Sequence, residues 1–323
     1  MYLKRILYVL PLAVLVGAGP AEEFPQAEIT NGIVRAKIYL QDAKKGYYRG
    51  TRFDWSGNMP ELEANGHTYF GQWFRRYDPT LHDAIMGPVE AFSPVGYDEA
   101  AVGENFLVIG VGMLAKPEED RYFFANKYQI VDAGSWKVKK KSSQIEFRHV
   151  LKDDAYAYDY TKTVALTQGK AELVLSHTFK NTGSKTIESQ VYNHNFFMLD
   201  NQPTGPDYVT TLTFEPSGDA GRTAARGRLE GNQILYNKPL ESGEHLQFES
   251  LVGFSDDAKD YDITIENRKT GAAVRITSDR PLSKLAFWSP ATTICPEPFI
   301  HVKVEPGEMF TWKTYYSFFD SRQ

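Results

Sequence analysis

The sequence is poor in cysteine and lacks the common motifs of metal, nucleotide and serine-nucleophile sites. Cys295 is the only cysteine, so an intramolecular disulfide is excluded and the fold must depend on its hydrophobic core. There is no His-Glu-x-x-His set, no Gly-x-Ser-x-Gly elbow and no phosphate-binding glycine loop. We therefore expect neither a metal nor a cofactor.

Long apolar runs are also scarce. The sequence contains one, near the N-terminus. Lys4 and Arg5 precede an uncharged, mostly apolar run over residues 6–19, and small residues suit cleavage after Ala21. This layout predicts a secretory signal peptide over residues 1–21, and the run is short for a membrane-spanning helix. A retained N-terminal anchor is the alternative. We expect an exported protein, periplasmic or secreted, with no membrane insertion after cleavage.

Charge and aromatic content narrow the class of partner. The net charge falls from −5 to −7 when Lys4 and Arg5 leave with the signal peptide, which argues against nucleic acid as a partner. Aromatic residues make up 14% of the chain, which suits both β-sheet surfaces and platforms on which sugars stack. The basic run at residues 137–141 is typical of a solvated strand edge.

Alternation of apolar and polar residues with a period of two dominates the chain, and helical periodicity is almost absent. Turn-forming residues separate many of the alternating runs. The predicted strands cover residues 33–40, 144–151, 157–166, 172–179, 187–192, 208–214, 246–254, 262–266, 272–277, 282–288 and 310–318. The best candidate for a helix or turn is at residues 117–120. We expect an all-β fold, a large antiparallel β-sandwich that forms one domain over residues 22–323.

Residues 47–103 differ from the rest because they are rich in Gly, Pro, Trp and Tyr and show little alternation. We interpret them as long ordered loops, which are where function usually lies on a β scaffold. They contain five polar residues of interest, which are Arg52, Asp54, His67, His82 and Glu90.

Two further segments contain candidate catalytic residues. His194 lies between two asparagines at the end of a predicted strand, and an imidazole suits proton transfer near neutrality. Glu297 lies between Pro296 and Pro298, which restrict the backbone around this carboxylate. Packing of the histidine and a rigid turn with an exposed acid are the structural alternatives. The remaining histidines, His149, His177, His245 and His301, lie in strand-like runs and are interpreted as sheet residues.

The order of these segments resembles the aldose 1-epimerase (galactose mutarotase) superfamily. The stretch Tyr-Asn-His-Asn-Phe-Phe around His194 is similar to the Asn-His-aromatic motif of that family, and Cys-Pro-Glu-Pro around Glu297 is similar to its C-terminal glutamate segment. His82, with Gly87 and Glu90 after it, is the best match to the family's upstream histidine. Asp83 stands where the family has glycine, so His67 remains a competitor for that role.

The resemblance implies a very large antiparallel β-sandwich and a cofactor-independent isomerase that acts at the anomeric carbon of a sugar or glycan chain end. Glu297 would be the base and His194 the acid, on opposite sides of the C1–O5 unit. His82 and Arg52 would bind hydroxyls or stabilise charge. Asp54 and His67 would also contact the sugar, with stacking faces from Trp55, Trp73 and Tyr69. The resemblance leaves the sugar and the oligomeric state open.

Two other functions are kept as alternatives. Large β-sandwiches also occur in polysaccharide lyases, in which a His or Tyr removes a proton next to a carboxylate that an Arg or Lys neutralises. The arginines of the loop region keep this alternative open, and they are Arg49, Arg52, Arg75 and Arg76. A carbohydrate-binding domain with an inactive site is the non-enzymatic alternative.

Overall fold

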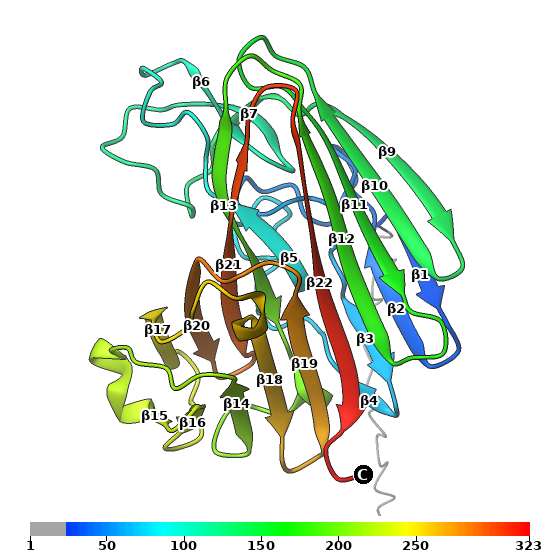
Figure 1. Cartoon of the computed structure of the whole chain (residues 1–323), viewed down its shortest axis with the longest axis vertical. Coiled ribbons are helices and arrows are strands. Elements are labelled where there is room, and N and C mark those ends of the chain that lie inside the picture. The colour runs from blue at the N-terminus through cyan, green and yellow to red at the C-terminus, as the bar shows by residue number, and fades with distance from the viewer. Residues whose placement is uncertain (1–23) are drawn as a thin grey trace, which may run out of the picture.

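The computed structural model describes residues 24–323, and their regular secondary structure consists almost entirely of antiparallel strands (Figure 1). The largest sheet has ten strands, of which β9 to β12 and β22 lie side by side along one flank. In spatial order the ten are β15 (Gly227–Glu230), β16 (Gln233–Tyr236), β14 (Tyr208–Leu212), β18 (Asp262–Asn267), β19 (Ala272–Ser278), β22 (Met309–Asp320), β12 (Glu172–Asn181), β11 (Tyr158–Leu166), β10 (Gln144–Leu151) and β9 (Ser135–Lys141).

A second sheet of five strands packs against the first. It consists of β17 (His245–Leu251), β20 (Lys284–Pro290), β21 (Cys295–Val304), β13 (Ile187–Phe196) and β5 (Gly87–Phe92). The smaller elements are β1 (Gln26–Thr30), β2 (Val34–Tyr39), β3 (Glu61–Ala64) and β4 (His67–Thr68) in one sheet, β6 (Asn105–Val108), β7 (Gly112–Ala115) and β8 (Gln129–Asp132) in another, and the 3-10 turns η1 (Leu199–Asn201), η2 (Gly221–Arg226) and η3 (Ala258–Asp260).

Period-two alternation explains how the two large sheets meet. Along β11 every second residue is buried, and β12 alternates in the same way over most of its length. Their apolar side chains join those of β13, β20 and β21 in one core. Each fully buried aliphatic or aromatic side chain of that core contributes about 1.5–3 kcal/mol relative to exposure. The predicted β-sandwich is therefore confirmed.

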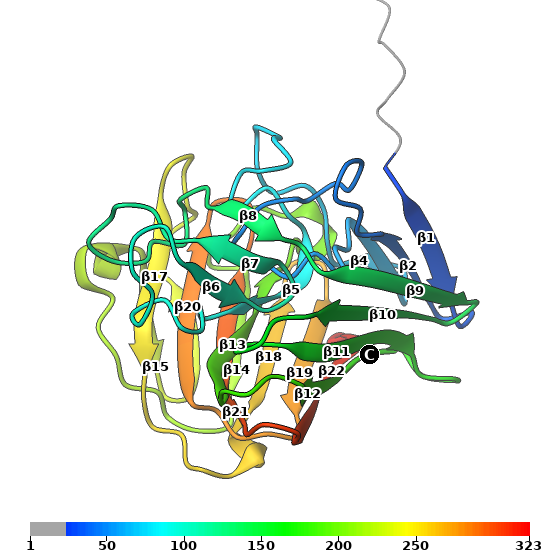
Figure 2. The same cartoon turned by 90° about the horizontal axis from the view of Figure 1, so that it is seen from above.

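The five-stranded sheet is covered on both faces at β5 and at the end of β13, whereas its outer face is open around Glu188 and His301. Its outer face carries a second apolar cluster, which includes Val89 and Phe196 from the sheet and Phe106 from β6. Figure 2, seen from above, places β6–β8 on one side of β5 and β11–β12 on the other. The loops between β2 and β8 thus cover the outer face of this sheet, and they do so over the end of β13.

The expectation of loops over residues 47–103 was wrong in part, because this region contains β3, β4 and β5. All six residues of β5 are buried, so its alternation is hidden because both faces are covered. Residues 117–120, expected as a helix or turn, contain bends at 118 and 120 and no helix. The basic run at residues 137–141 does lie in the edge strand β9. The predicted signal peptide lies outside the described residues.

Within residues 24–323, no helix has the length and apolar character needed to cross a membrane.

Candidate functional site

The outer face of the five-stranded sheet carries a recess of about 500 Å³. Residues directly opposite one another in an antiparallel pair project to the same face, and successive residues alternate. Tyr192 lies opposite Phe299, Phe299 opposite Lys284, and Gln247 opposite Trp288. This register places eight lining residues on one face, from four adjacent strands: Tyr192, His194, Phe196, Gln247, Lys284, Trp288, Glu297 and Phe299.

The loops that cover this face supply the rest of the lining, which is Arg52, Trp73, His82, Asp83 and Phe124. The indole of Trp73 stacks on Phe196 with ring centroids 4.9 Å apart, and its Nε1 donates to the Ile85 carbonyl at 3.0 Å. His82 Nε2 lies 3.6 Å from the Asp83 carboxylate, and burial lowers the pKa of His82. Trp73 and His82 thus have contacts within the protein before any ligand binds.

The two asparagines beside His194 hold its strand from the inner face. Asn193 donates to Glu90 at 3.0 Å, and these residues lie opposite each other in β13 and β5. Asn195 donates to the Pro296 carbonyl at 2.9 Å and accepts from Tyr316 at 2.9 Å. Because the chain alternates, two inward asparagines require an outward residue between them, and that residue is His194.

His194 and Glu297 meet in the recess. His194 Nε2 lies 3.2 Å from Glu297 Oε1, with the histidine side chain 3% exposed and the glutamate 14% exposed. The imidazole stacks on Phe196 at 3.9 Å and meets the edges of Phe53 and Trp288. Its Nδ1 is buried and has no hydrogen-bond partner within residues 24–323. Aromatic packing, rather than a hydrogen bond, therefore fixes this ring.

Burial shifts the pKa values of Glu297 and His194 in opposite directions. It raises the pKa of Glu297 to about 7, against the opposing effects of Arg52 and Lys284. Burial, with the Arg52 charge, lowers the pKa of His194 well below its ordinary value. Over the pH interval between these two shifted pKa values Glu297 is protonated and His194 is neutral, so the pair holds one proton. A pair with one proton contains one donor and one acceptor.

Arg52 is fixed more firmly than a usual surface arginine. Its guanidinium lies 4.5 Å from the ring centroid of Phe53 and 4.2 Å from that of Phe124. Nη2 donates to the Tyr192 hydroxyl at 3.0 Å. Nε is buried without a hydrogen-bond partner among the described residues. The remaining cation of the recess, Lys284, has its Nζ 5.1 Å from the ring centroid of Phe299.

Five of the residues expected from the sequence therefore lie around one recess: His194, Glu297, His82, Arg52 and Trp73. Three others do not line it, because their polar atoms are used inside the protein. Asp54 accepts from the backbone and hydroxyl of Ser56 at 2.9 and 2.8 Å. Trp55 donates to the Gly50 carbonyl at 2.8 Å, and Tyr69 donates to the Ala273 carbonyl at 3.2 Å.

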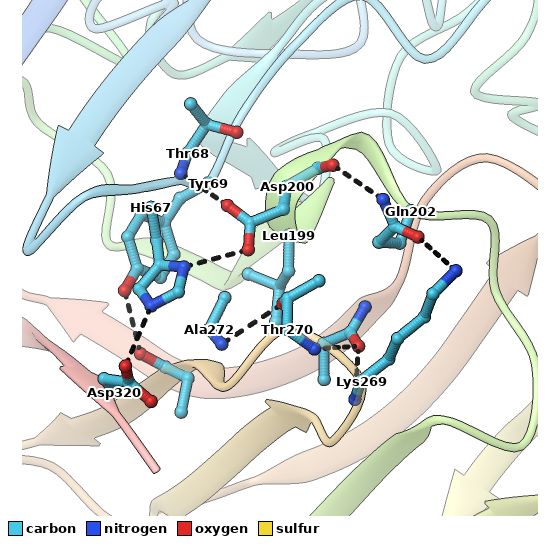
Figure 3. Close-up of polar contacts among 12 residues, drawn as sticks. His67, Thr68, Tyr69, Leu199, Asp200, Gln202, Lys269, Thr270, Ala272 and Asp320 are labelled. Atoms are coloured by element: carbon cyan, nitrogen blue, oxygen red, sulfur yellow. Dashed lines mark hydrogen bonds and ion pairs between the residues drawn. The ribbon is translucent and has the colours of Figure 1, made fainter. Parts of the chain in front are cut away.

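His67 also lies elsewhere, at the junction of β4, η1 and β22 (Figure 3). Its Nδ1 is 2.9 Å from Asp200 and its Nε2 is 3.6 Å from Asp320. Asp200 also accepts from the Thr68 backbone at 2.9 Å. His67 thus ties three segments together, and of the two upstream histidines His82 is the one in the recess.

Sequence reasoning gave no role to eight of the lining residues, which are Asp83, Phe124, Tyr192, Phe196, Gln247, Lys284, Trp288 and Phe299. Lys284 and Trp288 belong to a predicted strand and lie four positions apart, so alternation could have predicted that they share a face. Phe124 lies in a loop without periodicity, and no sequence signal marks it. Among the described residues, no group of three or more His, Cys, Asp or Glu is placed to hold a metal ion.

No protein-family model matches the chain, and no curated protein matches it either. Solved structures do share its fold. A protein from Synechocystis sp. PCC 6803 matches with a TM-score of 0.56 and 12% identity, over 95% of this chain and 100% of its own. A galactose mutarotase-related enzyme from Lactobacillus acidophilus matches at 0.53 and 13%, over 92% and 98%. A galactose mutarotase-like protein from Lactobacillus casei matches at 0.54 and 15%, over 91% and 100%. This chain therefore has the galactose mutarotase-like fold.

Proposed function

We propose that this chain, on its galactose mutarotase-like fold, is an exported isomerase of the aldose 1-epimerase type that interconverts the anomers of a sugar or glycan chain end. One observation carries the proposal: His194 and Glu297 are 3.2 Å apart in a recess of about 500 Å³ with aromatic walls. A cavity of this size with a few convergent polar groups suits a small ligand. Export rests on residues 1–21 alone.

The proposed reaction needs one proton acceptor and one proton donor. Ring opening removes the proton from the anomeric hydroxyl, forms the C1=O1 double bond as the C1–O5 bond breaks, and delivers a proton to O5. Both oxygens are bonded to C1, so a donor and an acceptor 3.2 Å apart can reach them from one side of the ring. We therefore propose approach from one side of the ring as the alternative to two groups on opposite sides.

The pKa directions also bear on the roles within the pair. The expected assignment has Glu297 as base and His194 as acid. A carboxyl with its pKa raised to about 7 and an imidazole with a lowered pKa favour the reverse starting state, with Glu297 donating and neutral His194 accepting. Both assignments place one proton on the pair, and ring closure returns it. No metal or cofactor enters either assignment.

The other lining residues would position the sugar. Trp73, Trp288 and Phe299 offer ring faces or edges to the apolar side of a pyranose. Arg52 and Gln247 offer donors to its hydroxyls, and fixed orientation of a bound sugar is itself a large part of catalysis. His82 lies at the same recess with Asp83, where it would act on hydroxyls rather than at C1.

Exchange between anomers tests the proposal directly. Polarimetry or NMR exchange on freshly dissolved neutral and acidic sugars is expected to show acceleration by the wild type. His194→Ala and Glu297→Gln should each lose about 10²–10⁴-fold, the usual contribution of a positioned acid or base. No acceleration with any sugar of the panel would refute the proposal.

The chain offers a matched control for these variants. Glu188 and His301 form a second contact between β13 and β21, with His301 Nε2 2.9 Å from Glu188 and both side chains about half exposed. Glu188→Gln and His301→Ala change the same residue types on the same strands, away from the recess. They should leave the rate unchanged.

A lyase remains the second candidate because Arg52 donates to Tyr192 at 3.0 Å beside His194. In that reaction Tyr192 or His194 would remove the proton next to a uronate carboxylate, Arg52 would neutralise the carboxylate, and the glycosidic oxygen would leave from C4. Uronate polymers should then yield an unsaturated product that absorbs in the ultraviolet. Binding without either reaction would favour a carbohydrate-binding domain.

A further inference from the structure

The recess contains two cationic side chains that have no acidic partner. Arg52 and Lys284 both line it, and neither forms an ion pair with any residue of the range 24–323. We propose that the sugar bound here carries a carboxylate, as a uronate does, and that Arg52 and Lys284 bind it. This inference rests on the proposed function and specifies its substrate class.

The fully buried cation of the core is paired. Lys162, which is fully buried in the core, contacts the Glu90 carboxylate and donates to the Ser56 carbonyl at 2.9 Å. Burying a charge is costly unless it is paired and hydrogen-bonded. Arg52 breaks that pattern, because its Nε is buried without a partner. An anion entering the recess would supply the missing acceptor.

The acids of the recess do not fill this role. Glu297 Oε1 contacts His194, and Asp83 Oδ2 contacts His82. Neither comes within 4 Å of a nitrogen of Arg52 or Lys284 among the described residues. Both cations act on Glu297 only through space, as their opposing effects on its pKa show.

The setting of Arg52 favours a planar anion. Phe53 and Phe124 lie 4.5 and 4.2 Å from the guanidinium carbon, and Tyr192 accepts from Nη2. A guanidinium held in this way offers its donors in one plane, which matches the two oxygens of a carboxylate. Lys284 is a point charge on a flexible stem, so it can approach the same group from β20.

Anomer exchange measured with matched sugars tests this inference. Glucuronate and galacturonate should be used with a kcat/KM at least about tenfold higher than glucose and galactose, and the advantage should shrink at high salt. Glucose 6-phosphate separates a carboxylate from a phosphate: preference for the phosphate would overturn the carboxylate assignment.

Variants separate recognition of the anion from an effect on Glu297. Arg52→Met should remove most of the preference for uronates, and Lys284→Met should reduce it without the risk to folding that a more enclosed residue brings. Arg75 is exposed, hydrogen-bonds Ser242 and lies outside the recess, so Arg75→Met is the matched control. Arg52→Met could instead lower the rate of anomer exchange equally for neutral and acidic sugars and shift both pH profiles equally. In that case the cations act on the pKa of Glu297 and not on the substrate, and the inference is overturned.

The outcomes also distinguish this inference from the proposed function. Equal use of glucose and glucuronate overturns the inference and leaves the isomerase standing. If no sugar is turned over, the isomerase fails, and calorimetry with glucuronate and glucose decides the inference alone. Tighter binding of glucuronate that Arg52→Met abolishes would then support it, and equal or absent binding would overturn it.

Discussion

Two histidine–glutamate contacts join the same face of the same two strands, yet their surroundings differ. His194 and Glu297 are 3% and 14% exposed, whereas His301 and Glu188 are 49% and 52% exposed. The loops over the recess cover the first pair and leave the second in solvent. Burial raises the pKa of Glu297 to about 7, whereas hydrogen bonds from His301 and Lys303 lower the pKa of Glu188. The covering loops, rather than the contact with histidine, therefore determine the direction in which the pKa of each glutamate shifts.

A third contact, on the opposite face, shows that burial alone does not make a site. Glu90 is fully buried, and His177, Asn193 and Lys162 all contact its carboxylate. These partners, Lys162 above all, lower the pKa of Glu90 to about 2 despite the opposing effect of burial. A buried acid with three partners is held in one state, whereas Glu297, with one partner beside a recess, can change its state.

The largest effect on stability is expected in the core network. Glu90→Gln would leave the buried Lys162 without its counter-charge, and breaking a buried pair from one side costs about 3–5 kcal/mol. Urea unfolding followed by circular dichroism measures this difference. A loss below about 1 kcal/mol would show that the contacts of Glu90 with its three partners do not hold this buried acid in one state.

Glu297→Gln should have the opposite effect on stability. A carboxyl whose pKa rises on folding from 4.5 to about 7 holds its proton more tightly when folded, so stability is lost as pH rises between these values. The ionised form costs the fold about 3 kcal/mol, and the neutral amide avoids that cost. The variant should therefore unfold at higher urea than the wild type at pH 8, and at the same urea at pH 4.

The pH dependence of anomer exchange should follow the number of protons that His194 and Glu297 hold together. The pair is active while it holds one proton, so the rate should fall as pH rises through about 7 and should stay level down to well below the ordinary pKa of histidine. A rate that rises through pH 7 would mean that the doubly deprotonated pair is the active form.

The exposed pair should give the smallest effect. Glu188→Gln removes a contact that solvent screens, and its effect on the urea midpoint and on anomer exchange should lie within experimental scatter. A clear loss of exchange in this variant would show that the face acts as a whole and that the covering loops do not define the site.

Much of this arrangement could be predicted from the sequence. Alternation predicted β10 to β14, β17 to β20 and β22, but not β21, which holds Glu297. The Asn-His-Asn segment and the proline-flanked Glu297 marked the two residues that meet in the recess. The asparagines were informative because Asn193 and Asn195 satisfy inward polar atoms, which forces His194 outward.

The rest depends on contacts that local sequence does not encode. Asp54 and His67 are polar residues in loops, and only the fold reveals that Ser56 and Asp200 are their partners. The strand β5 was not predicted because burial on both faces removes the alternation of apolar and polar residues. Phe124 contacts Arg52 from a loop 72 residues further along the chain, and no sequence pattern indicates this contact.

The most direct test of this comparison is a carboxyl-carbon NMR titration of Glu297 and Glu188 in one sample, assigned with Glu297→Gln and Glu188→Gln. We predict that Glu297 titrates near pH 7 and that the pKa of Glu188 lies below its ordinary value. If Glu297 titrates at or below 4.5, burial in the recess has not changed the carboxyl, and the proposed proton-sharing pair does not exist.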